Sequence, residues 1–226
     1  MLMTDGNIKA AMASGDLMIE GFSNSCLEAA SYDMRIGNRL LISSDETEID
    51  LAKRGGVTLA PGVFALLTTH EKVKLSNMIA GHIGVKSYYT RKGIMMLTGL
   101  QIDPGFEGVL VIGLYNASPR SFTLDYLAPF CTVEFHQLSQ PVDRPFVPGD
   151  EQKAGRIPRA DKDYLRTLET QSLSELGQSL RTLTQDVAGL TDQVSRLAAT
   201  QKNTQVGLAI GFAFLSILIA ILKLFH

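Results

Sequence analysis

Hydrophobic residues between about residue 34 and residue 146 come in short runs that are separated by turn signals. The runs include GVTLAPGVFALLTT, GVLVIGLYNAS and FTLDYLAPFCTVEFHQLS. Many short strands at this spacing are typical of a barrel or a sandwich. We therefore expect residues 1–146 to form a mainly β domain. The turns between its strands are expected at Gly55-Gly56, Pro61-Gly62, Pro104-Gly105 and Ser118-Pro119.

The two ends of this domain have a different pattern. Thr4 is a good helix cap, and Ile8, Ala11 and Met12 share one helical face, so a short helix is predicted within residues 4–16. Residues 147–163 have no hydrophobic period and contain PGDEQKAGRIPRADKD. This composition predicts an exposed arm or linker.

A heptad pattern follows in residues 164–203. Its apolar positions alternate in steps of three and four, with leucine at every d position, which is the seam of a self-associating coiled coil. A single amphipathic helix folded back onto the domain is the alternative. The seam consists of Leu173, Leu176, Leu180, Leu183, Val187, Leu190, Val194 and Leu197.

Residues 206–222 read VGLAIGFAFLSILIAIL and carry no charge. As a helix this run would be about 25 Å long, enough to span a membrane. The sequence thus predicts a transmembrane helix within residues 204–226, with a buried core helix as the alternative. Only four residues follow the run. The expected localisation is a single-pass membrane protein with a C-terminal anchor and its N-terminal domain in the cytosol.

Composition excludes several classes of function. The formal net charge is −2, so no overall basic field argues for a nucleic-acid polymer as partner. Cys26 and Cys131 lie far apart and outside any CxxC motif, which is unlike a disulfide framework or the PCxxC motif of a zinc base deaminase. The histidines also lack the spacing of metal ligands, and no zinc site is expected.

Two polar strings remain as candidates for chemistry. The string GHIGVKS ends at Ser87 and lacks the spacing of a phosphate-binding P-loop. Lys86, Ser87, Thr90 and Arg91 nevertheless form a polar cluster that could bind an anion, although a solvated turn explains it equally well. Asp103 precedes Pro-Gly, and this tripeptide is also what a tight turn alone requires.

Three strings together resemble the trimeric dCTP deaminase and dUTPase superfamily. They are ASYDMRIGN at residues 30–38, KSYYTRKG at residues 86–93 and IDPGFEG at residues 102–108. The order and separation are similar to the family's, and the likeness extends over about residues 1–163. The resemblance implies a distorted, dUTPase-like β-barrel that forms a homotrimer with sites at the subunit boundaries.

The same resemblance implies roles for individual residues. Lys86, Ser87 and Arg91 would hold a triphosphate, although Lys86 lacks the planar fork of the arginine usual there. Asp103 would face the deoxyribose 3′-hydroxyl and, in a dUTPase, help to place the attacking water. Phe106 would pack on the sugar, and Gln152 is a remnant of the arm that closes over the phosphates. Mg²⁺ would be carried on the nucleotide phosphates.

One position departs from the family. The deaminases carry a glutamate where this chain has Gly113. That glutamate moves protons, work that contributes about 10²–10⁴-fold to a rate, and glycine has no proton carrier.

The predicted function is therefore a membrane-anchored, dCTP deaminase-like protein that binds dCTP or dUTP, with deamination in doubt. An active dCTP deaminase or dUTP diphosphatase, a non-catalytic nucleotide sensor and a trimeric scaffold remain alternatives.

Overall fold

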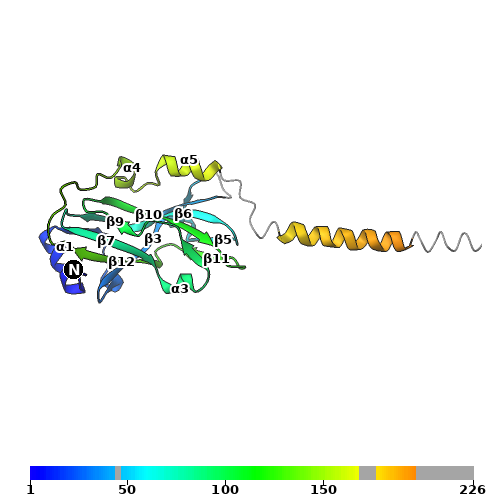
Figure 1. Cartoon of the computed structure of the whole chain (residues 1–226), viewed down its shortest axis with the longest axis horizontal. Coiled ribbons are helices and arrows are strands. Elements are labelled where there is room, and N and C mark those ends of the chain that lie inside the picture. Colours follow the sequence, from blue (N-terminus) through cyan, green and yellow to red (C-terminus); the bar gives the residue numbers. More distant parts are fainter. Residues whose placement is uncertain (44–46, 168–176, 197–226) are drawn as a thin grey trace, which may run out of the picture. The chain divides into compact units, whose positions relative to one another are not determined.

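The computed structural model of the chain describes residues 1–43, 47–167 and 177–196 (Figure 1). The chain divides into two compact units, Met1–Ser174 and Glu175–His226. The first unit is built mainly from β-strands (Figure 1), which confirms the mainly β character predicted for this domain.

The described helices and strands of the first unit follow one another in this order. They are α1 (Asp5–Ser14), β1 (Leu17–Glu20), the 3-10 helix η1 (Asn24–Cys26), β2 (Leu27–Glu28), β3 (Ser31–Ile42), β4 (Ile49–Asp50), α2 (Leu51–Arg54), β5 (Gly56–Leu59), β6 (Phe64–Leu75), β7 (Ile79–Val85), α3 (Ser87–Thr90), β8 (Ile94–Met96), β9 (Gln101–Ile102), β10 (Glu107–Asn116), β11 (Phe122–Asp125), β12 (Pro129–Gln137), α4 (Asp150–Lys153) and α5 (Arg159–Thr167).

One antiparallel sheet dominates the domain, with the strand order β8-β10-β6-β3-β12-β7-β9. The long strand β3 joins its two halves, because residues 32–35 pair with β12 and residues 36–42 pair with β6. Gly37 lies at this change of partner. A Cβ there would stand 2.5 Å from the carbonyl oxygen of Thr69, so only glycine lets the strands approach this closely. The sheet therefore curls around its core as a half-barrel.

The core lies inside this curl and takes the inward side chains of several strands. Tyr32, Leu40, Leu67, Ile112 and Phe135 are all fully buried. The alternation of buried and exposed residues along β1 and β12 is the two-residue period expected of half-buried strands. The short helix predicted within residues 4–16 is also confirmed as α1.

The segment 147–163, for which the sequence predicts an exposed arm or linker, is packed against the domain. It contains α4 and the beginning of α5. Ile157 and Leu165 are fully buried against Leu41, with Phe64 and Val111 beside them. Ile157 lies in the loop before α5 and Leu165 lies in α5, eight residues further on, so the two produce no visible period in the sequence.

Charged groups also hold α5 in place. Lys162 Nζ lies 2.5 Å from Glu48 Oε2, and Glu48 accepts a hydrogen bond from Arg39 as well. Burial alone would raise the pKa of Glu48, but the hydrogen bonds from Lys162 and Arg39 outweigh it and lower the pKa. The ionised Glu48 side chain thus holds α5 against the sheet through its ion pairs with Lys162 of α5 and Arg39 of β3.

In the second unit, residues 177–196 form a continuous helix. Five of the predicted seam residues lie in it, and their side chains are 55% to 64% exposed in the single chain. These are Leu180, Leu183, Val187, Leu190 and Val194. Leu173, Leu176 and Leu197 lie outside the described residues, and the coiled coil stays a prediction.

The predicted membrane localisation needs correction. Within residues 1–43, 47–167 and 177–196, no helix combines the length and the apolarity that crossing a membrane requires. The hydrophobic run at 206–222, within the segment 204–226 predicted to span a membrane, lies outside the described residues. A hydrophobic run shows only that a segment is long and apolar enough to span a membrane. It does not show that the segment forms such a helix.

Candidate functional site

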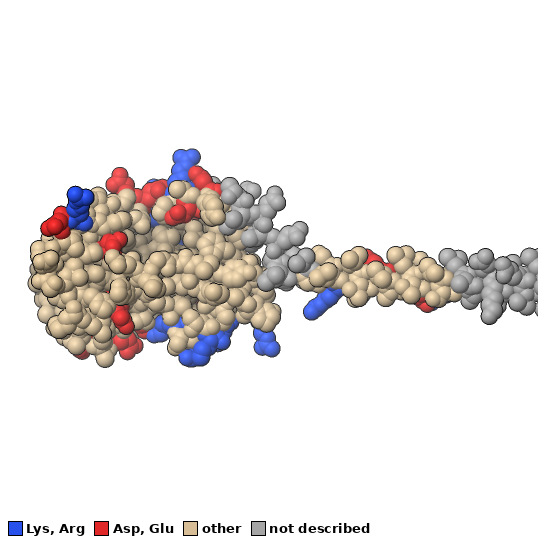
Figure 2. Space-filling model, viewed as in Figure 1, with Lys and Arg blue, Asp and Glu red and all other residues tan. Residues whose placement is uncertain are grey.

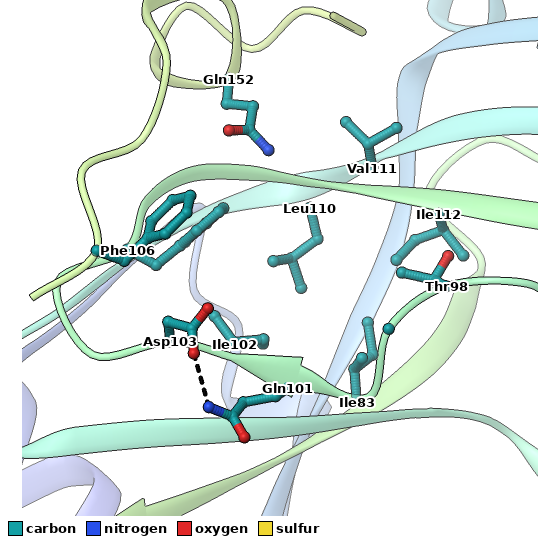
Figure 3. Close-up of a pocket in the computed structure, with 12 residues that line it drawn as sticks. Ile83, Thr98, Gln101, Ile102, Asp103, Phe106, Leu110, Val111, Ile112 and Gln152 are labelled. Carbon is teal, nitrogen blue, oxygen red and sulfur yellow. Dashed lines mark hydrogen bonds between the residues drawn. The ribbon is translucent and has the colours of Figure 1, made fainter. Parts of the chain in front are cut away.

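A pocket of about 220 Å³ lies between the turn joining β9 to β10 and the arm that carries α4 (Figure 3). One wall is apolar, and a few polar side chains converge on the cavity, which is the usual make-up of a small-molecule site. Its lining residues are Ile83, Thr98, Gly99, Gln101, Ile102, Asp103, Phe106, Leu110, Val111, Ile112, Phe146 and Gln152.

Asp103 is the one ionisable residue in this lining. Gln101 Nε2 donates a hydrogen bond to Asp103 Oδ1 at 2.6 Å, which orients the carboxylate (Figure 3). The backbone N–H of Phe106 donates to the Asp103 carbonyl at 3.1 Å and closes the turn. The other carboxylate oxygen, Oδ2, receives no hydrogen bond from the described residues, so it is available to a hydroxyl of a ligand.

The other side of the pocket is built by the arm. The rings of Phe106 and Phe146 stack at 6.0 Å between centroids. Figure 3 shows the Gln152 side chain extending from the arm toward the cavity, across from Asp103. The close approach depends on Gly108, where a Cβ would lie 2.7 Å from the carbonyl oxygen of Gln152. Three residues predicted from the sequence, Asp103, Phe106 and Gln152, therefore line one pocket.

Gly113 is not among the lining residues. Its N–H donates to Thr98 Oγ1 at 2.8 Å, and its carbonyl accepts from the Leu97 N–H at 2.8 Å. A Cβ at this position would stand 2.7 Å from the Leu97 carbonyl oxygen and 3.3 Å from the Phe64 ring. The segment after β8 thus fills the space that a side chain at position 113 would need.

The residues predicted to hold phosphate separate into two groups. Lys86 forms an ion pair with the buried carboxylate of Asp33, which also accepts a hydrogen bond from Thr132 at 2.7 Å. This ion pair leaves the Lys86 ammonium group less available to a ligand than the sequence predicts. Ser87 begins α3, and Arg91 follows its end and lines a different pocket, of about 620 Å³. A single chain does not bring Arg91 and Asp103 into one pocket.

Sequence reasoning missed Gln101 and Arg120. Gln101 stands two residues before Asp103, and the period of a strand places both on one face, so the signal was present. Arg120 lines the pocket of Arg91, but it lies 29 residues further along the chain, and no local pattern links the two.

The described part of the chain contains no cluster of side chains that could serve as ligands for a metal ion. There, no group of three or more His, Cys, Asp or Glu side chains could hold one. Asp103 is a lone carboxylate, so a Mg²⁺ ion at this pocket would need oxygen ligands from elsewhere, such as phosphates. Burial raises the pKa of the Cys131 thiol, which makes it an inert core residue.

Comparison with known proteins identifies the family. A family model described as dCTP deaminase-like matches residues 2–138. The chain belongs to the dCTP deaminase-like family. Curated relatives agree with this assignment. A dCTP deaminase of Pyrococcus horikoshii is 34% identical over 146 residues, which are 65% of this chain and 88% of that protein. One of Pyrococcus abyssi is 33% identical over 157 residues, 70% of this chain and 96% of that protein.

A solved structure supports the fold of this dCTP deaminase-like domain. The crystal structure of the 2′-deoxycytidine 5′-triphosphate deaminase of Agrobacterium tumefaciens superposes with a TM-score of 0.50 at 20% identity. The match covers 59% of this chain and 46% of that one. The likeness at this level concerns the fold alone.

Proposed function

We propose that this dCTP deaminase-like protein binds a pyrimidine deoxynucleoside triphosphate, dCTP or dUTP, in the pocket at Asp103 and does not deaminate it. The observation that carries the proposal is the lining of that pocket. It offers a carboxylate for a sugar hydroxyl, an aromatic wall and two side-chain amides, but Asp103 is its one ionisable group.

Deamination needs more than binding. Attack of water on C4 of cytosine requires a group that takes a proton from the water and passes one to the leaving amine. At position 113 the chain has no side chain, and the Leu97 carbonyl occupies the space. Asp103 is oriented by Gln101 and would be engaged by the sugar. The pocket therefore favours binding over deamination.

We propose that the binding unit is a homotrimer in which Asp103 of one protomer and Arg91 of its neighbour serve the same nucleotide. The separation of the two residues between two pockets of one chain supports this arrangement. Three apolar side chains in and after β8, Met95, Leu97 and Leu100, are 49% to 67% exposed, and such a group of exposed apolar residues suits a surface that another chain covers. The exposed seam of helix 177–196 supports self-association as well. Mg²⁺ would arrive on the nucleotide phosphates.

A second candidate is hydrolysis of dUTP between its α- and β-phosphates. The observation that favours it is Oδ2 of Asp103, which has two lone pairs and could orient a water molecule beside the sugar hydroxyl. This reaction needs no proton transfer at position 113.

The test is direct. Full-length protein is titrated calorimetrically with dCTP, dUTP and, as a control for base size, dGTP, each with Mg²⁺. The products are then followed by chromatography. The expected result is that dCTP or dUTP binds. We expect that dCTP is not converted to dUTP and that neither nucleotide is converted to a monophosphate. Release of dUTP from dCTP contradicts the proposal, release of dUMP supports the second candidate, and no binding of any nucleotide refutes both.

A further inference from the structure

A second pocket of the domain, away from Asp103, is bordered by three cations. Arg91 and Lys92 follow α3, and Arg120 lies in the turn between β10 and β11. All three side chains are exposed, and none makes an ion pair within residues 1–43, 47–167 and 177–196. Figure 2 shows basic side chains gathered on this edge of the domain, near the position of α3 in Figure 1.

Elsewhere on the domain, many basic side chains face a carboxylate. Arg35 pairs with Glu71, Lys74 with Glu107 and Lys162 with Glu48. Three unpaired cations around one pocket repel each other and raise the local positive potential. This arrangement favours an anionic ligand.

The turn that carries Arg120 is held by the hydrogen bonds of one buried side chain, Asn116. The Asn116 side chain is fully buried, and its Nδ2 donates to the Arg120 carbonyl and to the Leu59 carbonyl, each at 2.9 Å. Its Oδ1 accepts from both the N–H and the hydroxyl of Ser118. The backbone of Arg120 is therefore held in one conformation, which lowers the entropy lost on binding a ligand.

Gly93 brings this turn against α3. It has φ +84°, and a Cβ there would stand 2.8 Å from Ser118 Cβ. Its carbonyl accepts a hydrogen bond from the Ala117 N–H at 2.9 Å. Because a larger residue would push the two segments apart, Gly93 places Arg120 on the same pocket as Arg91.

The floor of the pocket is aromatic and rigid. Phe122 lines the pocket and packs on Tyr89, with 5.6 Å between ring centroids. Burial raises the pKa of Tyr89 to about 12, so its phenol stays neutral and donates to the Pro129 carbonyl at 3.1 Å. Lys92 Nζ lies 3.7 Å above the Tyr88 ring, which fixes this charge at the rim without neutralising it.

We infer that Arg120 and Lys92 are further phosphate-binding residues, which join Arg91 in holding an oligophosphate in this pocket. The inference rests on the proposed function, since the oligophosphate is taken to be the triphosphate of the bound nucleotide. Two guanidinium groups can each make paired hydrogen bonds to phosphate oxygens, which a lysine cannot.

The experiment compares Arg120→Gln with Arg54→Gln in the full-length protein. Arg54 is an exposed arginine on a different pocket, so the control removes the same charge elsewhere. Calorimetry measures the affinity of each protein for inorganic tripolyphosphate, for dCTP with Mg²⁺ and for deoxycytidine, at two salt concentrations.

The inference predicts that Arg120→Gln weakens tripolyphosphate and dCTP binding about tenfold and leaves deoxycytidine binding unchanged. It also predicts a shallower salt dependence, while Arg54→Gln behaves like wild type. Equal dCTP affinity in both variants overturns the role of Arg120 and leaves the proposed function standing. If tripolyphosphate binds through Arg120 but neither dCTP nor deoxycytidine binds, the anion site holds and the proposed function fails. A wild-type protein that does not bind tripolyphosphate overturns the inference.

Discussion

The two pockets of the β domain differ in almost every physical property. The pocket at Asp103 is small, walled by aliphatic and aromatic side chains and carries one carboxylate, whereas the pocket at Arg91 is larger and rimmed by three cations. The first suits a sugar and a base, and the second suits phosphate. A single chain keeps them apart, so under the proposed function a whole nucleotide site would form only between protomers.

The largest expected effect is at the carboxylate. Asp103→Asn keeps the size of the side chain but removes the charge that accepts a sugar hydroxyl. A lost charge-assisted hydrogen bond of about 1.5–3 kcal/mol weakens dCTP binding about 10- to 100-fold. Calorimetry measures this, with Asp16→Asn as an exposed control. Unchanged affinity in Asp103→Asn would remove this pocket from the site.

Position 113 tests whether deamination can be restored. Gly113→Glu is expected to stay inactive and to unfold more easily, by about 1–3 kcal/mol, because its Cβ meets the Leu97 carbonyl. Gly113→Ala carries the same Cβ and is expected to lose a similar free energy of unfolding in urea. If Gly113→Glu deaminates dCTP at full stability, Leu97 does not close this position.

Substitutions in the apolar seam of helix 177–196 are expected to have a smaller effect, and this effect is on assembly. Leu183→Glu combined with Leu190→Glu places charges on the exposed apolar stripe and is expected to weaken the trimer. Gln178→Glu combined with Gln185→Glu adds the same charge on the opposite face of the helix. Analytical ultracentrifugation should find more dissociation in the first variant, and equal behaviour of the two would argue against a coiled coil.

The smallest expected effect depends on pH. The pKa of Glu48 is lower in the folded chain than its ordinary value of 4.5, so the ionised group stabilises the fold above that pH. The stabilisation disappears as the pH falls below 4.5 through the folded pKa. Glu48→Gln should therefore cost about 0.5–1 kcal/mol at pH 7 and nothing at the lowest pH. Urea unfolding at several pH values measures the difference, and a constant difference contradicts the role of Glu48.

The comparison of the two pockets also explains what the sequence could reveal. Strands and α1 follow from local periodicity and capping, and Asp103 and Phe106 belong to one contiguous string. Arg120 and the buried contacts of Ile157 and Leu165 depend on residues distant in the chain, so no local pattern reports them. The sequence predicts that Lys86 faces a ligand, but its partner Asp33 lies 53 positions away in the chain, and no local pattern indicates this ion pair. The membrane prediction relied on hydrophobicity alone, and the described helices do not include a span.

Complementation in mixed trimers tests the shared site most directly. Asp103→Asn and Arg91→Gln chains are produced separately and together, and dCTP binding is measured at matched chain concentration. Each variant alone is expected to bind weakly. In random mixtures about a quarter of the boundaries join an intact Asp103 to a neighbour's intact Arg91, and these should bind dCTP with wild-type affinity. Mixtures that bind no better than the separate variants would contradict a nucleotide site formed between protomers.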